Sequence, residues 1–336
     1  MVAELLGGPG QVGVLSSTIF GGVSGSAVAD ASAIGSLLIP WQKRLGYPPA
    51  FSAATLAAAA TIDILIPPSI PMILFALVSN TSIASLFVAG ILPGLAMCAG
   101  FMVVCWWVGR RRNFPRETRP LDWAAFRKQL VYAAPALVLP VLIVVLLRFG
   151  IATPTEVAVL STLFAGLVSA LVYRDLGIKR LHDAIVHAGL ATGVVLLVIM
   201  ASAAIGWLLT FDRMPDGIVA WAQAHLSSGW SVILLMNLLM LVCGMFIDLP
   251  AAVLLLTPVF VPLANSIGMD LTQLGIMMTV NLAIGLYTPP VGTTLFITSA
   301  LAKVKVGQTV RELGPFYVVA FLILALVSYV PAVIFK

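Results

Sequence analysis

Ile66-Pro67-Pro68-Ser69 and Thr288-Pro289-Pro290-Val291-Gly292 are two double-proline stretches inside long apolar sequence, and they lie 222 residues apart. Proline lacks a backbone N–H and its ring clashes with the preceding helical turn, so each pair ends one helix and lets another begin. In lipid, such a break persists only where the freed backbone groups find partners. Each stretch therefore predicts a broken transmembrane helix with a polar environment at its centre.

The same offset aligns other helix-interrupting residues without a gap: Gly22 with Gly244, Pro40 with Pro262, Gly46 with Gly268 and Pro93 with Pro315. Four of the seven prolines between residues 15 and 94 fall on a second proline in this way, whereas composition alone predicts about 0.4. The sequence is therefore predicted to contain an internal repeat. Interruptions at corresponding positions of two halves are the best pointer to the binding site of a secondary transporter.

The composition is that of an integral membrane protein. Hydrophobic residues make up 61% of the chain and charged residues 9%, and the mean hydropathy is +1.10. A soluble domain carries about 25% charged residues. The three cysteines lie in apolar runs without the spacing of a metal site or a disulfide framework, so no metal cofactor is expected from them.

Basic residues set the predicted topology. The clusters 43–44, 110–128, 174–180 and 303–311 hold 15 of the 18 lysines and arginines. By the positive-inside rule they mark four cytoplasmic connections, which explains the net charge of +5 without a nucleic-acid partner. Residues 49–80 and 131–147 are then predicted to run outward. The remaining predicted spans are 84–108, 152–173, 186–210, 271–302 and 314–335.

Two further segments, 15–40 and 228–265, read as re-entrant helical hairpins. Each has two short apolar halves around a polar or glycine-rich centre, Gly21-Gly22-Val23-Ser24-Gly25-Ser26 and Gly244-Met245-Phe246-Ile247-Asp248. The base of the first hairpin carries Lys43 and Arg44, and the base of the second carries no lysine or arginine. The two hairpins are therefore predicted to enter from opposite sides of the membrane, as an inverted repeat requires.

The predicted organisation has four parts. Residues 1–108 form the first repeat, 109–130 a basic cytoplasmic loop, 131–226 the scaffold helices of the second repeat, and 227–336 the second hairpin, broken helix and last span. Scaffold helices corresponding to 131–210 would fall before Met1. The symmetry therefore predicts that the chain is an N-terminally truncated permease, or that another polypeptide supplies these helices.

Three runs of sequence carry a family resemblance. These runs are Ile19-Phe20-Gly21-Gly22-Val23-Ser24-Gly25-Ser26-Ala27-Val28-Ala29-Asp30, Ile66-Pro67-Pro68-Ser69-Ile70-Pro71 and Asn281-Leu282-Ala283-Ile284-Gly285-Leu286-Tyr287-Thr288-Pro289-Pro290-Val291-Gly292. All three resemble the large membrane subunit (DctM type) of TRAP transporters, the tripartite ATP-independent periplasmic carriers. Residues 244–248 are similar to the tip of that subunit's second hairpin. The resemblance covers nearly the whole chain.

The resemblance implies an elevator-type importer of small organic acids such as dicarboxylates, coupled to sodium, in the bacterial inner membrane. It implies two partners, a small four-helix membrane subunit and a periplasmic substrate-binding protein, and no cofactor other than the coupling ions. The sequence has no GxxxxGK[ST] motif of an ATPase. A stand-alone sodium/anion symporter of the same superfamily is the alternative, and a membrane-embedded enzyme lacks a recognisable nucleophile and base.

The breaks also suggest how a site is built. Half-helices are predicted to start near Ser26, Ser69, residues 248–251 and Gly292, and their free N–H groups suit a substrate carboxylate. Half-helices are predicted to end near Gly22, Ile66, Ile247 and Leu286, and their free carbonyls suit sodium. Anion and cation would thus meet in one pocket.

Several side chains have both a functional and a structural interpretation. Asp30 and Asp63 are intramembrane carboxylates, which cost about 2.5–3.5 kcal/mol on insertion and are candidate ligands, or else partners of nearby backbone donors. Asp248 precedes Leu249-Pro250 and is expected to act as an N-cap. Asn281 either contacts the pocket or joins two helices. The full candidate set is Ser24, Gly25, Ser26, Asp30, Asp63, Pro67, Pro68, Ser69, Gly244, Asp248, Asn281, Thr288, Pro289, Pro290, Gly292 and Thr293.

Overall fold

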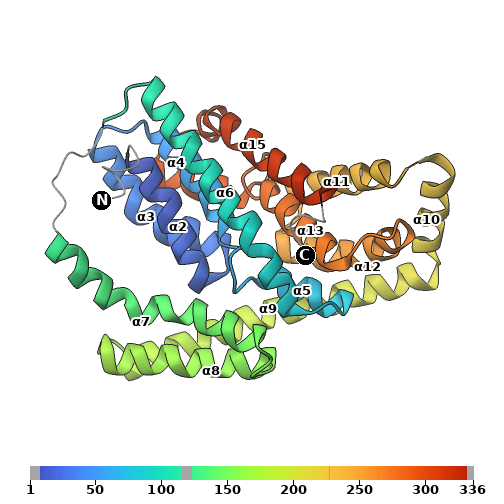
Figure 1. The fold of residues 1–336 in the computed structure, drawn as a ribbon, viewed down its shortest axis with the longest axis horizontal. Helices are drawn as coiled ribbons and strands as arrows, with labels where there is room; N and C mark the ends of the chain where they lie inside the picture. The colour runs from blue at the N-terminus through green and yellow to red at the C-terminus, as the bar shows by residue number, and fades with distance from the viewer. Residues whose placement is uncertain (1–7, 116–122, 227, 331–336) are drawn as a thin grey trace.

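The computed structural model describes residues 8–115, 123–226 and 228–330, and all regular secondary structure in these ranges is helical (Figure 1). Seven helices among the described residues are long and apolar enough to cross a membrane, and they include both arms of the second predicted hairpin. The predicted fold class, an all-helical polytopic membrane protein, is confirmed. Residues 116–122 of the predicted basic loop and the last residues of the predicted span 314–335 lie outside the described ranges.

The first half begins with a helical hairpin. Helices α2 (Pro9–Ser24) and α3 (Ala27–Arg44) are joined by Gly25 and Ser26. Gly25 has φ +65°, and its backbone N–H donates to the Gly21 carbonyl at 3.4 Å, which closes α2 with a left-handed cap. The Ser26 hydroxyl accepts from the Ala29 N–H at 3.4 Å and begins α3.

A broken helix follows the hairpin. Helix α4 (Pro49–Ala59) ends in a 3₁₀ turn, η1 (Ala60–Ile62), and the chain restarts as α5 (Ile70–Ser79) after the double proline. Helix α6 (Ile83–Arg111) then returns, and its last turn places Arg110 over the Trp106 ring and Arg111 over the Trp107 ring. Such aromatic and basic side chains are typical of a helix end at a membrane interface.

The second half repeats this order. Helices α11 (Gly229–Phe246) and α12 (Leu249–Ser266) form a hairpin, α13 (Leu271–Gly285) and α14 (Thr293–Ala302) flank the second break, and α15 (Val306–Tyr329) follows. Helix α13 begins 222 residues after α4, the offset read from the prolines. Both proline pairs contain a cis peptide bond, Pro67–Pro68 and Pro289–Pro290.

The two halves interlock rather than lie apart. Helix α3 packs against α14, and α12 packs against α5, so the second arm of each hairpin contacts the second half-helix of the other repeat. Side chains also cross the boundary: Lys43 Nζ donates to the Ala302 carbonyl at 3.0 Å, Thr294 Oγ1 donates to the Ala57 carbonyl at 3.1 Å, and Arg112 pairs with Glu312 at 2.7 Å. Both hairpin tips and both breaks are thereby held in one region.

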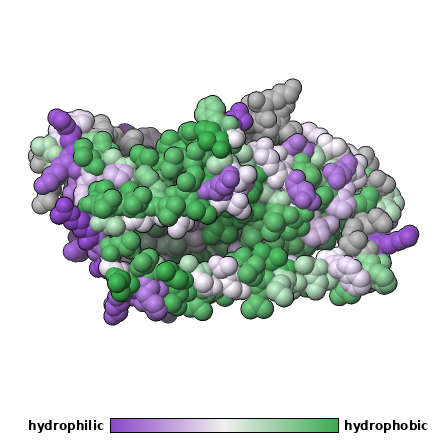
Figure 2. Space-filling view, turned by 90° about the horizontal axis from the view of Figure 1, so that it is seen from below, coloured by the Kyte–Doolittle hydropathy of each residue, from purple (hydrophilic) through white to green (hydrophobic). Residues whose placement is uncertain are grey.

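Four helices connect the halves along the lower and right edges of Figure 1. They are α7 (Trp123–Arg148), α8 (Pro154–Leu167) with a π-helical turn (Val168–Val172), α9 (Ile178–Phe211) and α10 (Met214–His225). Helix α7 contacts α2 and α6, and α9 contacts α12. Their side chains are mostly exposed and apolar, and the face seen in Figure 2 is largely hydrophobic, with a group of strongly hydrophilic side chains at its left end and others scattered toward its right end.

Several helices begin earlier than the sequence predicted. Helix α7 begins at Trp123 instead of 131, α9 at Ile178 instead of 186, and α15 at Val306 instead of 314. Hydropathy marks only the apolar part of a helix, whereas the helix extends to a residue that can satisfy its first N–H groups. Helix α10 was not predicted as an element.

The contact between Gly244 in α11 and Gly285 in α13 brings two backbones together. A Cβ built on Gly285 would overlap the Gly244 carbonyl. We expect Gly285→Val to lower the stability by about 1–3 kcal/mol, because hairpin and broken helix must separate. The thermal unfolding midpoint in detergent measures this. Gly193→Val in α9 is the control, since a Cβ added there would meet nothing within 4 Å, and an equal loss in both variants would contradict the expectation.

Candidate functional site

A cavity of about 270 Å³ lies where the two hairpin tips meet the two helix breaks. The first tip contributes Gly25, Ser26, Ala27 and Val28, and the first break contributes Ile64, Ile70 and Pro71. The second tip contributes Asp248, Leu249 and Pro250, and the second break contributes Leu286. All four interruptions of the repeat thus line a single cavity.

The predicted helix starts are confirmed. Helices α3, α5, α12 and α14 begin after the N-cap positions Ser26, Ser69, Asp248 and Gly292. The first turns of α3, α5 and α12 line the cavity directly. A helix N-terminus carries a partial positive charge and free N–H groups, so these three starts make the cavity favourable for an anion.

Asp63 ties the first break to the first hairpin tip. Its buried carboxylate accepts the N–H of Gly25 at 3.1 Å and the N–H of Ser26 at 3.2 Å. Two glycines make room for this contact. A Cβ on Gly21 would lie 2.8 Å from the Asp63 Cα, and a Cβ on Gly25 would overlap the Pro68 carbonyl. Asp63 therefore caps the hairpin tip from outside, using the N–H groups at the start of α3.

Asp30 lies one turn into α3 and is fully buried. The buried Ser17 hydroxyl interacts with the Asp30 carboxylate, but within the described residues neither group makes a hydrogen bond of normal geometry. Asp30 also interacts electrostatically with Asp63. Buried charge of this kind requires a compensating partner. The sequence reasoning missed Ser17, although a serine two turns before the hairpin tip was a usable signal.

Hydroxyl groups donate to backbone carbonyls at corresponding positions of the two breaks. The Ile64 carbonyl accepts from Ser69 Oγ at 2.5 Å, and the Leu286 carbonyl accepts from Thr294 N at 3.0 Å and Thr294 Oγ1 at 2.9 Å. Ile64 and Leu286 are 222 residues apart. The prediction of a free carbonyl at Leu286 is therefore wrong, because the Thr294 N–H donates to it and the Thr294 hydroxyl, whose one hydrogen is shared with the Ala57 carbonyl, does so as well. Thr294 was not among the predicted residues.

The second tip is built differently from the first. Asp248 stands at the N-cap of α12 and lines the cavity, yet its exposed carboxylate makes no hydrogen bond to that helix. The expected capping bond is absent, although Ser69, whose helix also has a proline at its second position, accepts the Met72 N–H at 3.4 Å. The second tip is instead held by a backbone bond from Val291 N–H to the Met245 carbonyl at 3.2 Å.

Asn281 does not line the cavity and serves to join helices. Its Nδ2 donates to the backbone carbonyl and to Oδ1 of Asn237 in α11, both at 2.9 Å. Asn237 Nδ2 in turn donates to Ser328 Oγ in α15 at 3.0 Å. Of the two interpretations of Asn281, the structure supports the helix-joining one. Asn237 was missed, because a single polar residue in an apolar helix does not reveal its partner.

The other predicted residues lie around the breaks. Thr288 Oγ1 donates to the Ile284 carbonyl at 2.6 Å, whereas the buried Thr293 hydroxyl has no partner among the described residues. Ser24, at the end of α2, interacts with Asp63. The residues brought together at the first tip are thus Ser24, Gly25, Ser26, Asp30 and Asp63. Pro67, Pro68, Pro289, Pro290, Gly244 and Gly292 shape the backbone of the breaks and of the second tip.

Comparison with known proteins was consistent with this architecture. The family model of the tripartite ATP-independent periplasmic transporter, DctM component, matches residues 1–333. The uncharacterized protein y4mL of Sinorhizobium fredii is 57% identical over 97% of this chain and 78% of its own length. The C4-dicarboxylate TRAP transporter large permease protein DctM of Pseudomonas aeruginosa is 35% identical over 99% of this chain and 78% of its own length.

A third relative is the sialic acid TRAP transporter large permease protein SiaM of Vibrio cholerae. It is 34% identical over 98% of this chain and 77% of its own length. The match of the family model over nearly the whole chain and the long alignments confirm the resemblance read from the hairpin and break motifs. The chain belongs to the DctM family of TRAP transporter large permease subunits, a family of transporters of the bacterial inner membrane, and is itself a multi-pass membrane protein.

Proposed function

We propose that this chain is the permease subunit of a sodium-coupled secondary transporter that imports small organic acids delivered by a periplasmic binding protein. The observation that carries the proposal is the convergence of both hairpin tips and both breaks on one cavity. A site made by two interlocked repeats, with helix ends at its centre, is the arrangement in which secondary transporters bind substrate. The family membership supports transport as the activity.

The substrate class follows from the helix N-termini and from the relatives. Two relatives are named for C4-dicarboxylate and for sialic acid, which are both carboxylates. Asp63 already holds the N–H groups of Gly25 and Ser26 at the start of α3. A substrate carboxylate is expected to bind at the first-turn N–H groups of α3, α5 and α12, which line the cavity and are not held by Asp63.

Sodium is the proposed coupling ion at the first tip. Asp30 and Asp63 are both buried there, and the Asp30 oxygens and the Ser17 hydroxyl have no hydrogen-bond partner among the described residues. Carboxylate, hydroxyl and carbonyl oxygens are the ligands that hard cations prefer. A bound cation would offset the charge of both carboxylates and stabilise the tip that lines the substrate cavity. Ion and substrate would then favour each other's binding.

Two partners complete the proposal. The family description names a tripartite system, which agrees with a small membrane subunit and a periplasmic binding protein beside this chain. The exposed apolar surfaces of α7, α8 and α9 leave room for lipid and for another membrane subunit. The alternative is a stand-alone sodium/anion symporter, which would need neither partner.

Reconstitution into liposomes tests the function and its alternative together. The vesicles contain this chain and its small subunit, and the binding protein and a labelled dicarboxylate or sialic acid are added outside. They should accumulate substrate only under an inward sodium gradient. Omission of the binding protein should abolish uptake. Uptake without binding protein would favour the stand-alone symporter, and uptake without sodium would refute the coupling.

Ser26→Leu should crowd the first tip, since Ser26 lines the cavity and its N–H is held by Asp63. We expect sodium-driven uptake to fall at least tenfold while expression stays near normal. The control is Ser36→Leu, two to three turns further along α3 on an exposed position. Unchanged sodium dependence in Ser26→Leu would remove this tip from the site.

A further inference from the structure

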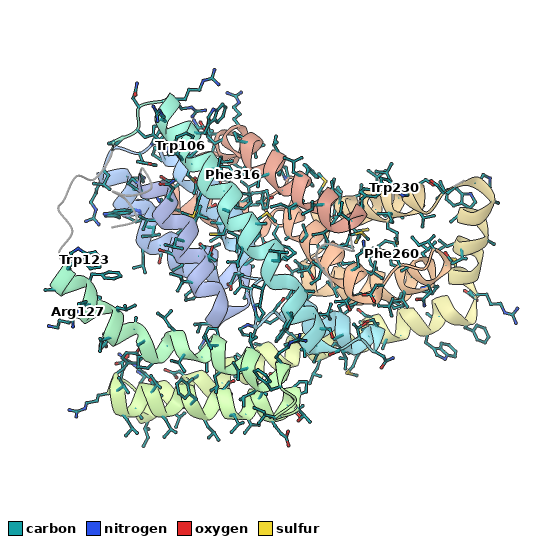
Figure 3. All side chains as sticks on the ribbon, viewed as in Figure 1. Trp106, Trp123, Arg127, Trp230, Phe260 and Phe316 are labelled. Carbon is teal, nitrogen blue, oxygen red and sulfur yellow. The ribbon has the colours of Figure 1, made fainter. Side chains whose placement is uncertain are left out.

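A second and larger cavity, of about 1020 Å³, lies outside the site described above. Its walls come from α5 and α6 on one side and from α7 and α8 on the other, and Val23 and Pro68 of the first tip and first break close one part of it. Figure 3 shows the side chains of α7 and α8 reaching toward the rest of the molecule along its lower edge. The cavity thus lies between α7 and α8 and the half of the molecule that carries the first tip.

The lining excludes a charged ligand. None of the residues that line this cavity is charged, and most are aliphatic, such as Ile73, Leu77, Leu139 and Ile143. Water gains few hydrogen bonds from such walls, and an unfilled space of this size loses the dispersion contacts of its lining. A small organic acid would lose its hydration without a compensating partner. The chemistry of the walls fits an extended hydrocarbon.

The cavity has five polar lining residues, and three of them lie at helix ends. Asn80 and Thr81 follow the end of α5, and Thr155 lies in the first turn of α8. The outward direction inferred for 49–80 and for the span before α8 puts these residues at the outer interface. Deeper in α8, the buried Ser161 hydroxyl lines the cavity and has no hydrogen-bond partner in the described part of the chain. An apolar body with a polar rim matches an amphiphile whose head lies at the interface.

We propose that this cavity binds one phospholipid, with an acyl chain between α5 and α8 and its polar ester region near Asn80 and Thr155. The lipid fills the space between the connecting helices and the first tip, and its chain contacts Val23 and Pro68. It is therefore a structural ligand placed beside the transport site. This inference concerns a different cavity from the proposed function, and each can fail without the other.

Retention of lipid after delipidation tests the proposal. The purified chain is washed repeatedly in detergent, and bound phospholipid is quantified by extraction and native mass spectrometry. We expect about one retained phospholipid for each wild-type chain. Ala158→Trp and Ala165→Trp fill the cavity from α8 and should each reduce retention at least fivefold. Leu163→Trp, on an exposed α8 position outside the lining, is the matched control and should retain lipid as the wild type does.

A second measurement does not depend on a substitution. Phosphatidylethanolamine with a photoactivatable group midway along one acyl chain is added to the wild-type chain in nanodiscs, and the cross-linked residues are mapped. We expect adducts on Ile73, Ile143 and Ala158, which all line the cavity from different helices. Two results would overturn the proposal. One is that adducts are confined to outward-facing positions of α7 and α8. The other is that the Ala158→Trp and Ala165→Trp variants fold and retain as much lipid as the wild type.

Discussion

Replacing Pro289 and Pro290 together by alanine should leave a chain that inserts and folds but loses substrate and sodium binding at the same time. Helix α13 ends at Gly285 and α14 begins at Thr293. Two alanines favour a continuous helix across this gap by about 3 kcal/mol for each proline removed from a helix interior. A continuous helix from α13 into α14 would remove the Thr294 contacts to the Leu286 carbonyl. It would also move Leu286, which lines the cavity. The matching change at Pro67 and Pro68 should act in the same way.

Calorimetric titration of sodium and substrate measures this effect in detergent or nanodiscs. We expect at least a hundredfold loss of affinity for both ligands. Pro135→Ala inside α7 is the control, because Pro135 belongs to neither helix break and lines neither cavity. Wild-type sodium affinity in either double variant would show that the proline breaks serve packing only.

Asp63→Ala should release the first hairpin tip. The substitution leaves the Ser26 N–H without its acceptor and the Gly25 N–H with only the 3.4 Å contact to the Gly21 carbonyl, and an unsatisfied buried donor costs about 1–3 kcal/mol. We expect sodium-driven uptake to be abolished and hydrogen exchange of residues 24–27 to rise at least tenfold. Asp63→Asn keeps one acceptor oxygen without the charge, so it should restore much of the exchange protection but little of the sodium response.

This pair of variants separates a positioning role of Asp63 from a charge role. Asp183→Ala, which removes an exposed carboxylate near the start of α9, is the control for nonspecific loss of negative charge. Unchanged exchange at the tip in Asp63→Ala would contradict the capping contact. A full sodium response in Asp63→Asn would show that the carboxylate charge is not needed for the ion.

The sequence alone determined the features that depend on local chemistry. Hydropathy and charge identified a polytopic membrane protein, and the proline pairs located both breaks and the offset at which α13 follows α4. The starts of α3, α5, α12 and α14 were also predicted correctly. Proline, glycine and capping residues act on the backbone within one turn of themselves, so their effect can be read from neighbouring residues.

The tertiary structure decided which groups find each other. Asp63 holds Gly25 and Ser26, Thr294 satisfies Leu286 and reaches Ala57, and Asn281 joins Asn237 rather than the cavity. The expected free carbonyl at Leu286 failed because Thr294 reaches it across the second break. Each of these contacts depends on how the helices and breaks are placed in space. A side chain's own residue type shows that it needs a partner, but the partner is set by the interlocking of two repeats that lie far apart in the chain.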